Sequence, residues 1–163
     1  MIHSDHAGRK MPEGDGTLRP GFRNPLDVRL GYQLRRASVA VMADLAGRLG
    51  PIGLRPTEAT ILMVVDANPA ITQSDIGRML GIKRANMAPL TASLCKRGLV
   101  ERVPADGRSH ALRLSREGKR LAAAIGRCIE ENEAQAFRLL SDEARGAFAA
   151  SLPALWADRP ISG

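Results

Sequence analysis

The fold of this chain is decided by residues 72–118, which read TQSDIGRMLGIKRANMAPLTASLCKRGLVERVPADGRSHALRLSREG. Thr72 can cap a helix that carries the acidic Asp75 in its first turn, so this stretch opens with a helix start. The short helix is predicted to run from Gln73 to Leu80, and Gly81 supplies the turn that follows it. We expect three of its side chains to face inward: Ile76, Met79 and Leu80.

A second helix is predicted from about Lys83 to Arg97, and Gly98 ends it as a C-cap. Its buried stripe has helical spacing and consists of Met87, Leu90 and Leu94. Two short helices joined at a glycine turn form a helix-turn-helix. Pro89 lies inside the second helix, where it removes one backbone hydrogen bond and should bend the axis.

A β-hairpin is predicted directly after the second helix. Residues 99–103 alternate like a strand, residues 104–107 form a turn with an Asp-Gly pair, and residues 111–114 alternate again. The tip of this hairpin carries Arg108 and His110. A winged helix carries its wing at this position.

Longer helices flank the central stretch. Asn24-Pro25 predicts the start of a long helix that ends before Gly50-Pro51. Its apolar stripe is Leu26, Leu30, Leu34, Ala37, Val41, Leu45 and Leu49. Pro56 opens a helix that is apolar around most of its circumference, so we expect it to be central.

The C-terminal part is predicted to hold two more helices. Ser115 caps a long one that runs to about Leu139. Ser141 starts the last one, in which Pro153 should cause a kink. Its inward side chains are expected to be Ala144, Phe148, Leu152 and Leu155.

The predicted fold is therefore mainly α with a small β-hairpin wing: a winged helix-turn-helix with long N- and C-terminal helices. We expect a single domain over residues 24–158, with the winged helix-turn-helix at about 54–114. The flanking helices lie at about 25–49 and 115–156. Residues 1–23 are rich in glycine, proline and charge, and they are predicted to form a flexible tail.

Charge is concentrated in the central stretch. The 163-residue chain has a net charge of +7, and residues 72–113 hold eight Lys or Arg against three Asp or Glu. A basic segment within a folded region indicates a polyanion site, usually nucleic acid, although a generally basic protein would look the same.

Several classes of protein are disfavoured by what the sequence lacks. The two cysteines have no paired spacing, and no His/Cys cluster occurs, which argues against a disulfide framework and against a metal site. There is no phosphate-binding glycine loop and no HExxH, so neither a catalytic site nor a cofactor is expected. Without a signal peptide or a long apolar stretch, the expectation is a cytoplasmic protein with no membrane partner.

Three strings of residues resemble the MarR family of bacterial transcription factors over about residues 26–156. Asp106-Gly107-Arg108, followed by Leu114-Ser115-Arg116-Glu117-Gly118, looks like the family's wing signature. Residues 73–82 resemble its first short helix and turn, and residues 94–100 look like the end of its recognition helix.

The resemblance implies a homodimer whose first and last two helices interleave, bound to a pseudo-palindromic double-stranded operator. It also implies a repressor released by a small-molecule effector, and we expect a phenolic acid or its thioester. Two alternatives stay open. One is a winged-helix protein-interaction module that binds no DNA, and the other is a regulator that senses redox state through Cys95 or Cys128.

The predicted DNA contacts begin with the second short helix, which should enter the major groove with its N-terminal half. Its outward side chains there are Lys83, Arg84, Ala85, Asn86 and Ala88. Arg84 suits guanine and Asn86 suits adenine, while the alanines can touch thymine methyl groups. The alternatives are phosphate contact or solvation for Lys83 and Arg84, and helix capping for Asn86.

Further contacts are predicted outside that helix. Arg108 at the wing tip can reach a minor groove or a phosphate, and Asp106 can hold it in position. Thr72 and Gln73 can bind phosphate at the start of the preceding helix.

The resemblance also implies an effector pocket where the dimer helices meet the winged domain. Its candidate residues come from three helices: Tyr32, Arg35, Arg36, Val39, Met42, Leu62, Val65, Ile125, Ile129 and Asn132. Arg35 or Arg36 can pair with an anionic ligand. Ordinary core packing and solvation are the alternatives for these side chains.

Overall fold

The structure is a computed structural model that describes residues 23–104 and 110–157. The chain divides into two compact units between Arg36 and Ala37, and each unit is described by itself. The elements along the chain are α1 (Leu30–Leu49), η1 (Gly50–Ile52), α2 (Pro56–Ala67), β1 (Ile71–Thr72), α3 (Gln73–Leu80), α4 (Arg84–Lys96), β2 (Val100–Pro104), β3 (His110–Leu114), α5 (Arg116–Ala136), α6 (Asp142–Ser151) and η2 (Pro153–Leu155). The predicted fold class, mainly helical with a small sheet, is confirmed.

In the first unit, the long helix begins later than the sequence predicted. Helix α1 begins at Leu30, because Asn24 caps a turn that precedes the helix rather than the helix itself. The Asn24 side-chain oxygen accepts a hydrogen bond from the Leu26 amide at 3.0 Å, which is a local turn of the kind asparagine favours. Its side-chain nitrogen donates to the hydroxyl of Tyr32 at 2.9 Å.

The sheet contains one strand that the sequence did not reveal. β2 and β3 form the predicted antiparallel hairpin, in register from Val100 opposite Leu114 to Pro104 opposite His110. β1 adds to the other side of β3, which gives the strand order β1-β3-β2. With two residues, β1 is too short to show alternation. Most of the predicted hairpin turn lies outside the described residues.

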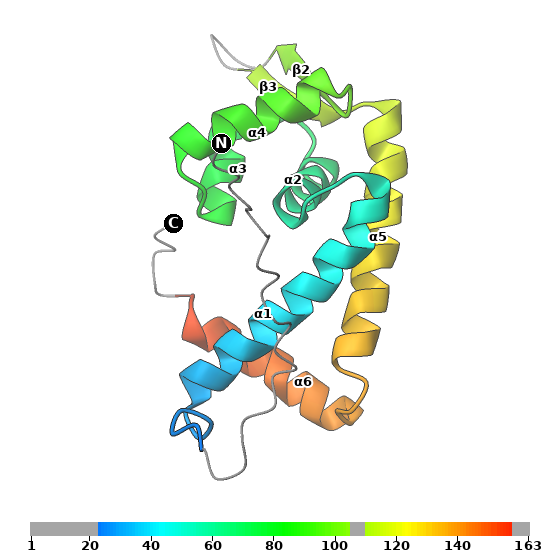
Figure 1. Cartoon of the computed structure of the whole chain (residues 1–163). Helices are drawn as coiled ribbons and strands as arrows, with labels where there is room; N and C mark the ends of the chain where they lie inside the picture. Colours follow the sequence, from blue (N-terminus) through cyan, green and yellow to red (C-terminus); the bar gives the residue numbers. More distant parts are fainter. Residues whose placement is uncertain (1–22, 105–109, 158–163) are drawn as a thin grey trace, which may run out of the picture. The chain divides into compact units, whose positions relative to one another are not determined.

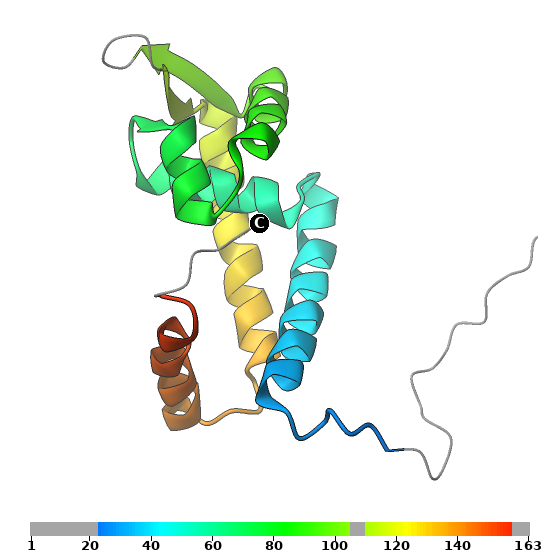
Figure 2. The same ribbon diagram turned by 90° about the vertical axis from the view of Figure 1, so that its left-hand side faces the viewer.

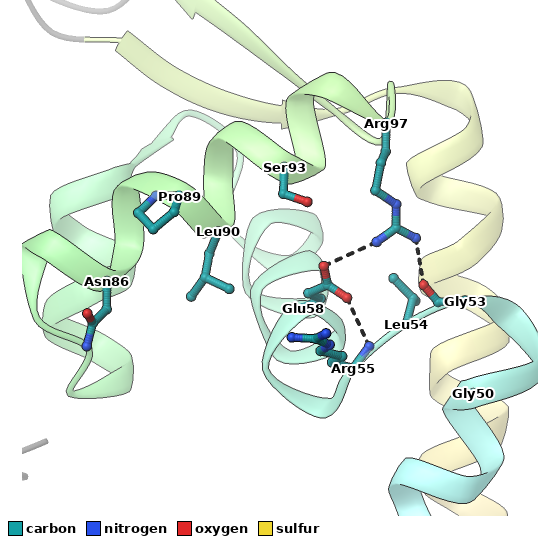
Figure 3. Close-up of a pocket in the computed structure, with 10 residues that line it drawn as sticks. All are labelled: Gly50, Gly53, Leu54, Arg55, Glu58, Asn86, Pro89, Leu90, Ser93 and Arg97. Atoms are coloured by element: carbon teal, nitrogen blue, oxygen red, sulfur yellow. Dashed lines mark hydrogen bonds and ion pairs between the residues drawn. The ribbon is translucent and has the colours of Figure 1, made fainter. Parts of the chain in front are cut away.

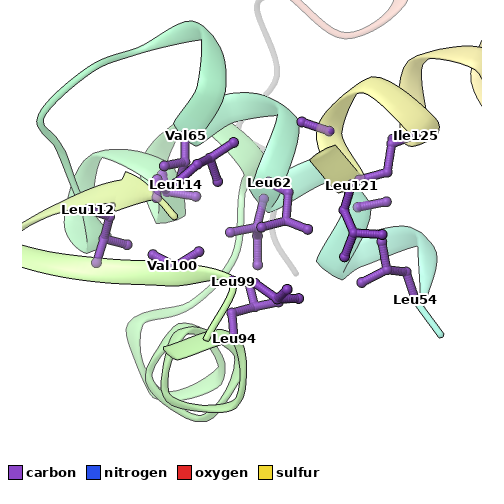
Figure 4. Packing of buried hydrophobic residues seen from close by; sticks show 14 of the residues in the cluster. Leu54, Leu62, Val65, Leu94, Leu99, Val100, Leu112, Leu114, Leu121 and Ile125 are labelled. Carbon is purple, nitrogen blue, oxygen red and sulfur yellow. The ribbon is translucent and has the colours of Figure 1, made fainter. Parts of the chain in front are cut away.

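The core of the second unit is built around α2, as its apolar circumference predicted. Ile61 and Leu62 of α2 are fully buried, and α2 contacts α3, α5 and β3. Figure 4 shows part of this core, in which Leu62 of α2 belongs to the same cluster as Leu94 of α4 and Ile125 of α5. Because one cluster joins these elements, the helix-turn-helix and the sheet are held at one end of α5, and α6 follows its other end (Figures 1 and 2).

Some side chains that were expected to face inward are exposed. Met79 is 55% exposed near the end of the eight-residue α3, so its predicted burial is wrong. Ile76 is fully buried and Leu80 packs against the core, as expected. Ala144, Phe148 and Leu155, also expected to face inward, are exposed in the single chain. Helix α6 ends at Ser151, and the predicted disturbance at Pro153 takes the form of the short helix η2.

No single helix among the described residues is long and apolar enough to cross a membrane, and only the pair Leu30–Ile52 and Pro56–Ala67, bent by 77°, passes a test of length and composition.

The start of α5 explains why the wing is followed by serine and, three residues later, glycine. The Ser115 hydroxyl oxygen accepts a hydrogen bond from the Gly118 amide at 3.0 Å, and the hydroxyl donates to the Gly98 carbonyl at 2.7 Å. Gly118 is buried against the backbone of Leu99, so close that an added Cβ would lie 2.1 Å from the Leu99 carbonyl oxygen. This contact ties the base of the wing to α5.

Gly118→Ala should therefore destabilise the protein by about 1–3 kcal/mol, because backbone must shift to make room for the methyl group. Gly126→Ala on the same helix is the matched control, since nothing lies within 4 Å of its added Cβ. The control should gain roughly 0.5–1 kcal/mol from helix propensity. Urea unfolding at one fixed protein concentration measures both, and equal shifts for the two variants would contradict this packing.

Candidate nucleic-acid interface

A groove of about 510 Å³ lies where the start of α3, the start of α4 and the sheet come together. Its lining residues are Thr72, Gln73, Ser74, Arg84, Arg102, His110 and Leu112. Three of the residues predicted to contact DNA, namely Thr72, Gln73 and Arg84, are thus brought to one surface. Among its described lining residues are two arginines and a histidine but no acidic side chain, which suits an anionic ligand.

The start of α3 is fixed by a capping box. The Thr72 hydroxyl oxygen accepts from the Asp75 amide at 3.2 Å, and the Thr72 amide donates to the Asp75 carboxylate at 3.4 Å. Hydrogen bonds from Thr72 and Arg78 to the carboxylate lower the pKa of Asp75 from its ordinary value. The Thr72 hydroxyl also donates to the Asp75 carboxylate, so the cap uses both donors of Thr72. Gln73 follows it in the lining of the groove.

Gln73 is also held by the recognition-helix candidate α4. The buried Thr91 hydroxyl lies 2.8 Å from the Gln73 side-chain oxygen, which links the first turn of α3 to the middle of α4. Helix α4 is continuous through Pro89, which is exposed. The bend expected at Pro89 stays a prediction.

The first turn of α4 is positively charged, whereas a helix start normally favours negative charge. It contains no acidic residue, while Lys83 is its N-cap and Arg84 its first residue. Both side chains are exposed, and neither forms an ion pair with another described residue. The positive end of a helix dipole repels cations, so this arrangement costs stability unless an anion binds there.

Other arginines of this region are already paired with carboxylates. Arg78 pairs with Asp75, Arg97 with Glu58, and Arg113 with Glu101. Among the described residues of the groove, Arg84 and Arg102 have no such partner. They are therefore the cations with the most capacity for phosphate or base contact.

Arg102 was not predicted, and the strand pattern explains why. Strict alternation places Arg102 on the same face as the buried Val100, yet Arg102 is exposed and stands opposite Leu112 at the groove. A charged residue at an expected inward position of the wing was the signal available. His110, which the sequence placed near the wing tip, lies in the same groove.

The remaining predicted DNA contacts have different placements. Ala85 and Ala88 are exposed on α4, as expected. Asn86 is exposed too, but it lines a second cleft, on the side of α4 that faces the start of α2 (Figure 3). Asp106 and Arg108 lie outside the described residues, so their roles stay predictions.

The effector candidates fall into three groups. Tyr32, Arg35 and Arg36 belong to the first unit, where the Arg36 guanidinium lies 5.9 Å from the Tyr32 ring centre. Leu62, Val65 and Ile125 pack in the core of the second unit. The other four candidates also belong to the second unit. Val39 and Met42 are exposed, Ile129 is half-buried, and Asn132 has a buried oxygen without a hydrogen-bond partner among the described residues.

Asn132 has an unusual environment. Its side chain is almost completely buried, at 2% exposure, and its side-chain oxygen has no hydrogen-bond partner among the described residues. Buried acceptors are normally paired, since an unpaired one costs about 1–3 kcal/mol. This oxygen can therefore receive a donor from a ligand or a water molecule.

The two cysteines are free and half-buried. The Cys128 sulfur lies 3.7 Å from the Arg48 carbonyl oxygen. In the part of the chain that the structure describes, no three His, Cys, Asp or Glu side chains gather as a metal site requires.

Comparison with known proteins gives consistent results. The model of the MarR family matches residues 52–109. A solved structure of the transcriptional repressor CouR is 31% identical, with a TM-score of 0.72, over 79% of this chain and 93% of that one. The proposed transcriptional regulatory protein for the hcr operon of Thauera aromatica is 26% identical over 130 residues, 78% of each chain.

Two further structures of CouR contain ligands. One is bound to a 23-mer DNA duplex and is 33% identical, with a TM-score of 0.72, over 77% of this chain and 91% of that one. The other is bound to p-coumaroyl-CoA and is 32% identical, with a TM-score of 0.71, over 80% of this chain and 92% of that one.

Proposed function

The chain belongs to the MarR family of transcriptional regulators, and we propose that it represses transcription as a homodimer bound to operator DNA until a small-molecule effector releases it. The observation that carries DNA binding is the start of α4, where Lys83 and Arg84 add charge to the positive end of the helix dipole without a carboxylate partner in the described chain. A DNA phosphate or base edge offsets that unfavourable arrangement.

The groove suggests which residues contact DNA phosphates and which contact bases. Gln73 and Arg102 bind phosphates and so fix the register of the protein on the duplex, while Thr72, whose amide and hydroxyl are used in the capping box, positions the start of α3. Arg84 enters the major groove and reads guanine, flanked by Ala85 and Ala88, whose methyl groups can contact thymine. Arg108, held by Asp106, extends the interface from the wing tip.

Homodimer formation is supported by apolar side chains that the single chain leaves uncovered. Val39 on α1 is 62% exposed, Leu139 after α5 is 82% exposed, and Trp156 after η2 is 55% exposed. Where such side chains form one contiguous patch, they mark an interface. We propose that a second copy of this chain covers it, as the family resemblance implies.

We propose an aryl-CoA thioester, such as that of a phenolic acid, as the effector. The likeness to CouR bound to p-coumaroyl-CoA supports this class of ligand. The unpaired oxygen of Asn132 supports a ligand that carries a hydrogen-bond donor, such as a phenolic hydroxyl. Val39, Met42 and Ile129 offer apolar contact in the same unit.

Fluorescence anisotropy on the DNA just upstream of the gene for this protein tests the proposal. We expect tight binding that unlabelled DNA of the same sequence competes away and scrambled DNA does not. Adding p-coumaroyl-CoA should release the DNA, whereas coenzyme A alone should not. If the protein binds no DNA at low salt, it acts as a protein-interaction module instead. DNA binding that the thioester does not change contradicts only the effector.

A further inference from the structure

The second cleft, of about 730 Å³, separates α4 from the segment that joins α1 to α2. Figure 3 shows its wall on the α4 side and its wall on the α2 side. The α4 side is lined by Asn86, Pro89, Leu90, Ser93 and Arg97, and the other side by Gly50, Gly53, Leu54, Arg55 and Glu58. Packing in the core holds α4 through the neighbouring face, which carries Met87 and Leu94.

Arg97 bridges this cleft from the C-cap position of α4. One of its guanidinium nitrogens donates to the Glu58 carboxylate at 3.2 Å, and another donates to the Gly53 carbonyl at 2.7 Å. No other hydrogen bond between described residues joins α4 to the segment from Leu49 to Glu58. The bridge thus supplies the polar connection between the candidate recognition helix and the end of α1.

Glu58 is suited to anchor the bridge because its carboxylate is buried and fully used. The Glu58 side chain is only 12% exposed, and its second oxygen accepts from the Arg55 amide at the start of α2, at 3.0 Å. A buried carboxylate without its cation is unfavourable, so Glu58 and Arg97 hold each other in place. The planar guanidinium presents a separate nitrogen to each acceptor, a fork that the single ammonium of a lysine does not have.

We infer that Arg97 and Glu58 are positioning residues for DNA recognition: they set the orientation of α4 against the α1–α2 joint and touch no DNA themselves. This inference rests on the proposed function. Both terminal nitrogens of Arg97 already donate within the protein, and the Glu58 carboxylate offsets its charge, so Arg97 is less suited to a phosphate than the unpaired Arg84. Arg84, at the other end of α4, is the residue whose placement depends on the angle of the helix.

The sign of the effect of Glu58→Gln tests this inference. Removing a negative charge should strengthen DNA binding if charge alone matters, and it would free Arg97 for a phosphate. If the bridge positions α4, the same substitution should weaken binding, by roughly 2- to 30-fold. Glutamine can still accept from the Arg55 amide, so the cap of α2 is retained.

We would measure anisotropy on the upstream DNA for wild type, Glu58→Gln, Arg97→Gln and the double variant, well below the unfolding temperature of each. Asp142→Asn on α6 is the matched control, because it removes one negative charge from an exposed ion pair. Arg97→Lys keeps the charge but loses the two-acceptor bridge, so it should weaken binding as well. The double variant should bind no more weakly than the weaker single variant.

The outcomes separate the two claims. Weaker binding by Glu58→Gln and Arg97→Lys, with Asp142→Asn unchanged, supports positioning. Unchanged or tighter binding by Glu58→Gln, with a loss only in Arg97→Gln, makes Arg97 a direct phosphate contact and overturns the inference. If wild-type protein binds no DNA, the proposed function fails and the inference falls with it.

Discussion

Replacing Arg84 with alanine should weaken binding to the specific DNA site by at least roughly 30-fold, because one bidentate base contact provides about 1–3 kcal/mol and the proposed homodimer loses two of them. Arg84 is exposed at the first position of α4, lines the groove and has no ion-pair partner among the described residues. Nothing within the described protein uses its guanidinium, and it lies at the positive end of the helix dipole, so the substitution should not lower stability. Affinity for random DNA should fall much less.

Arg127→Ala on α5 is the matched control for this prediction, since it removes one exposed positive charge outside the groove. Anisotropy with the specific duplex and with a scrambled one measures both variants. A loss in Arg84→Ala that is equal on the two duplexes would show a phosphate contact without base readout, which contradicts the assigned role.

Introducing a charge at the proposed dimer interface should separate the subunits. Leu139 is 82% exposed in the single chain, immediately after α5, so Leu139→Glu costs little in an isolated subunit. In a two-fold dimer each substitution occurs twice, and two unpaired carboxylates would become buried. We expect sedimentation at micromolar concentration to show a shift from dimer to monomer, with a loss of operator affinity of at least about tenfold.

Ala123→Glu is the control, because it introduces the same charge at an exposed position of α5 away from Leu139. It should stay dimeric and bind DNA normally. If Leu139→Glu also stays dimeric, then Leu139 lies outside the interface, and the exposed apolar surface must be assigned to another partner.

The local signals of the sequence predicted most of the winged domain. Helix ends are set by residues within a few positions of them, here the caps Thr72 and Ser115 and the glycines 81 and 98. The boundaries of α3, α4 and α5 are therefore close to those expected. The start of α1 was misplaced because Asn24 caps a turn as readily as it caps a helix.

Features that depend on residues distant in sequence could not be predicted. Glu58 and Arg97 lie 39 positions apart, and no periodicity connects them. Strand β1 forms only because β3 supplies its partner. Similarly, an apolar stripe indicates that a helix buries one face, but it cannot tell whether the cover is the same chain, as at Leu49, or a second copy, as we propose for Val39.

If this basic surface binds operator DNA, the affinity must depend on salt, and a salt titration measures that dependence. Anisotropy of wild-type protein on the upstream duplex should give a linear fall of log K against log salt concentration, with a slope of about −5 or steeper if the dimer contacts six or more phosphates. Excess scrambled DNA should not compete at moderate salt. Binding that is absent at low salt, or that does not change with salt, would contradict the account.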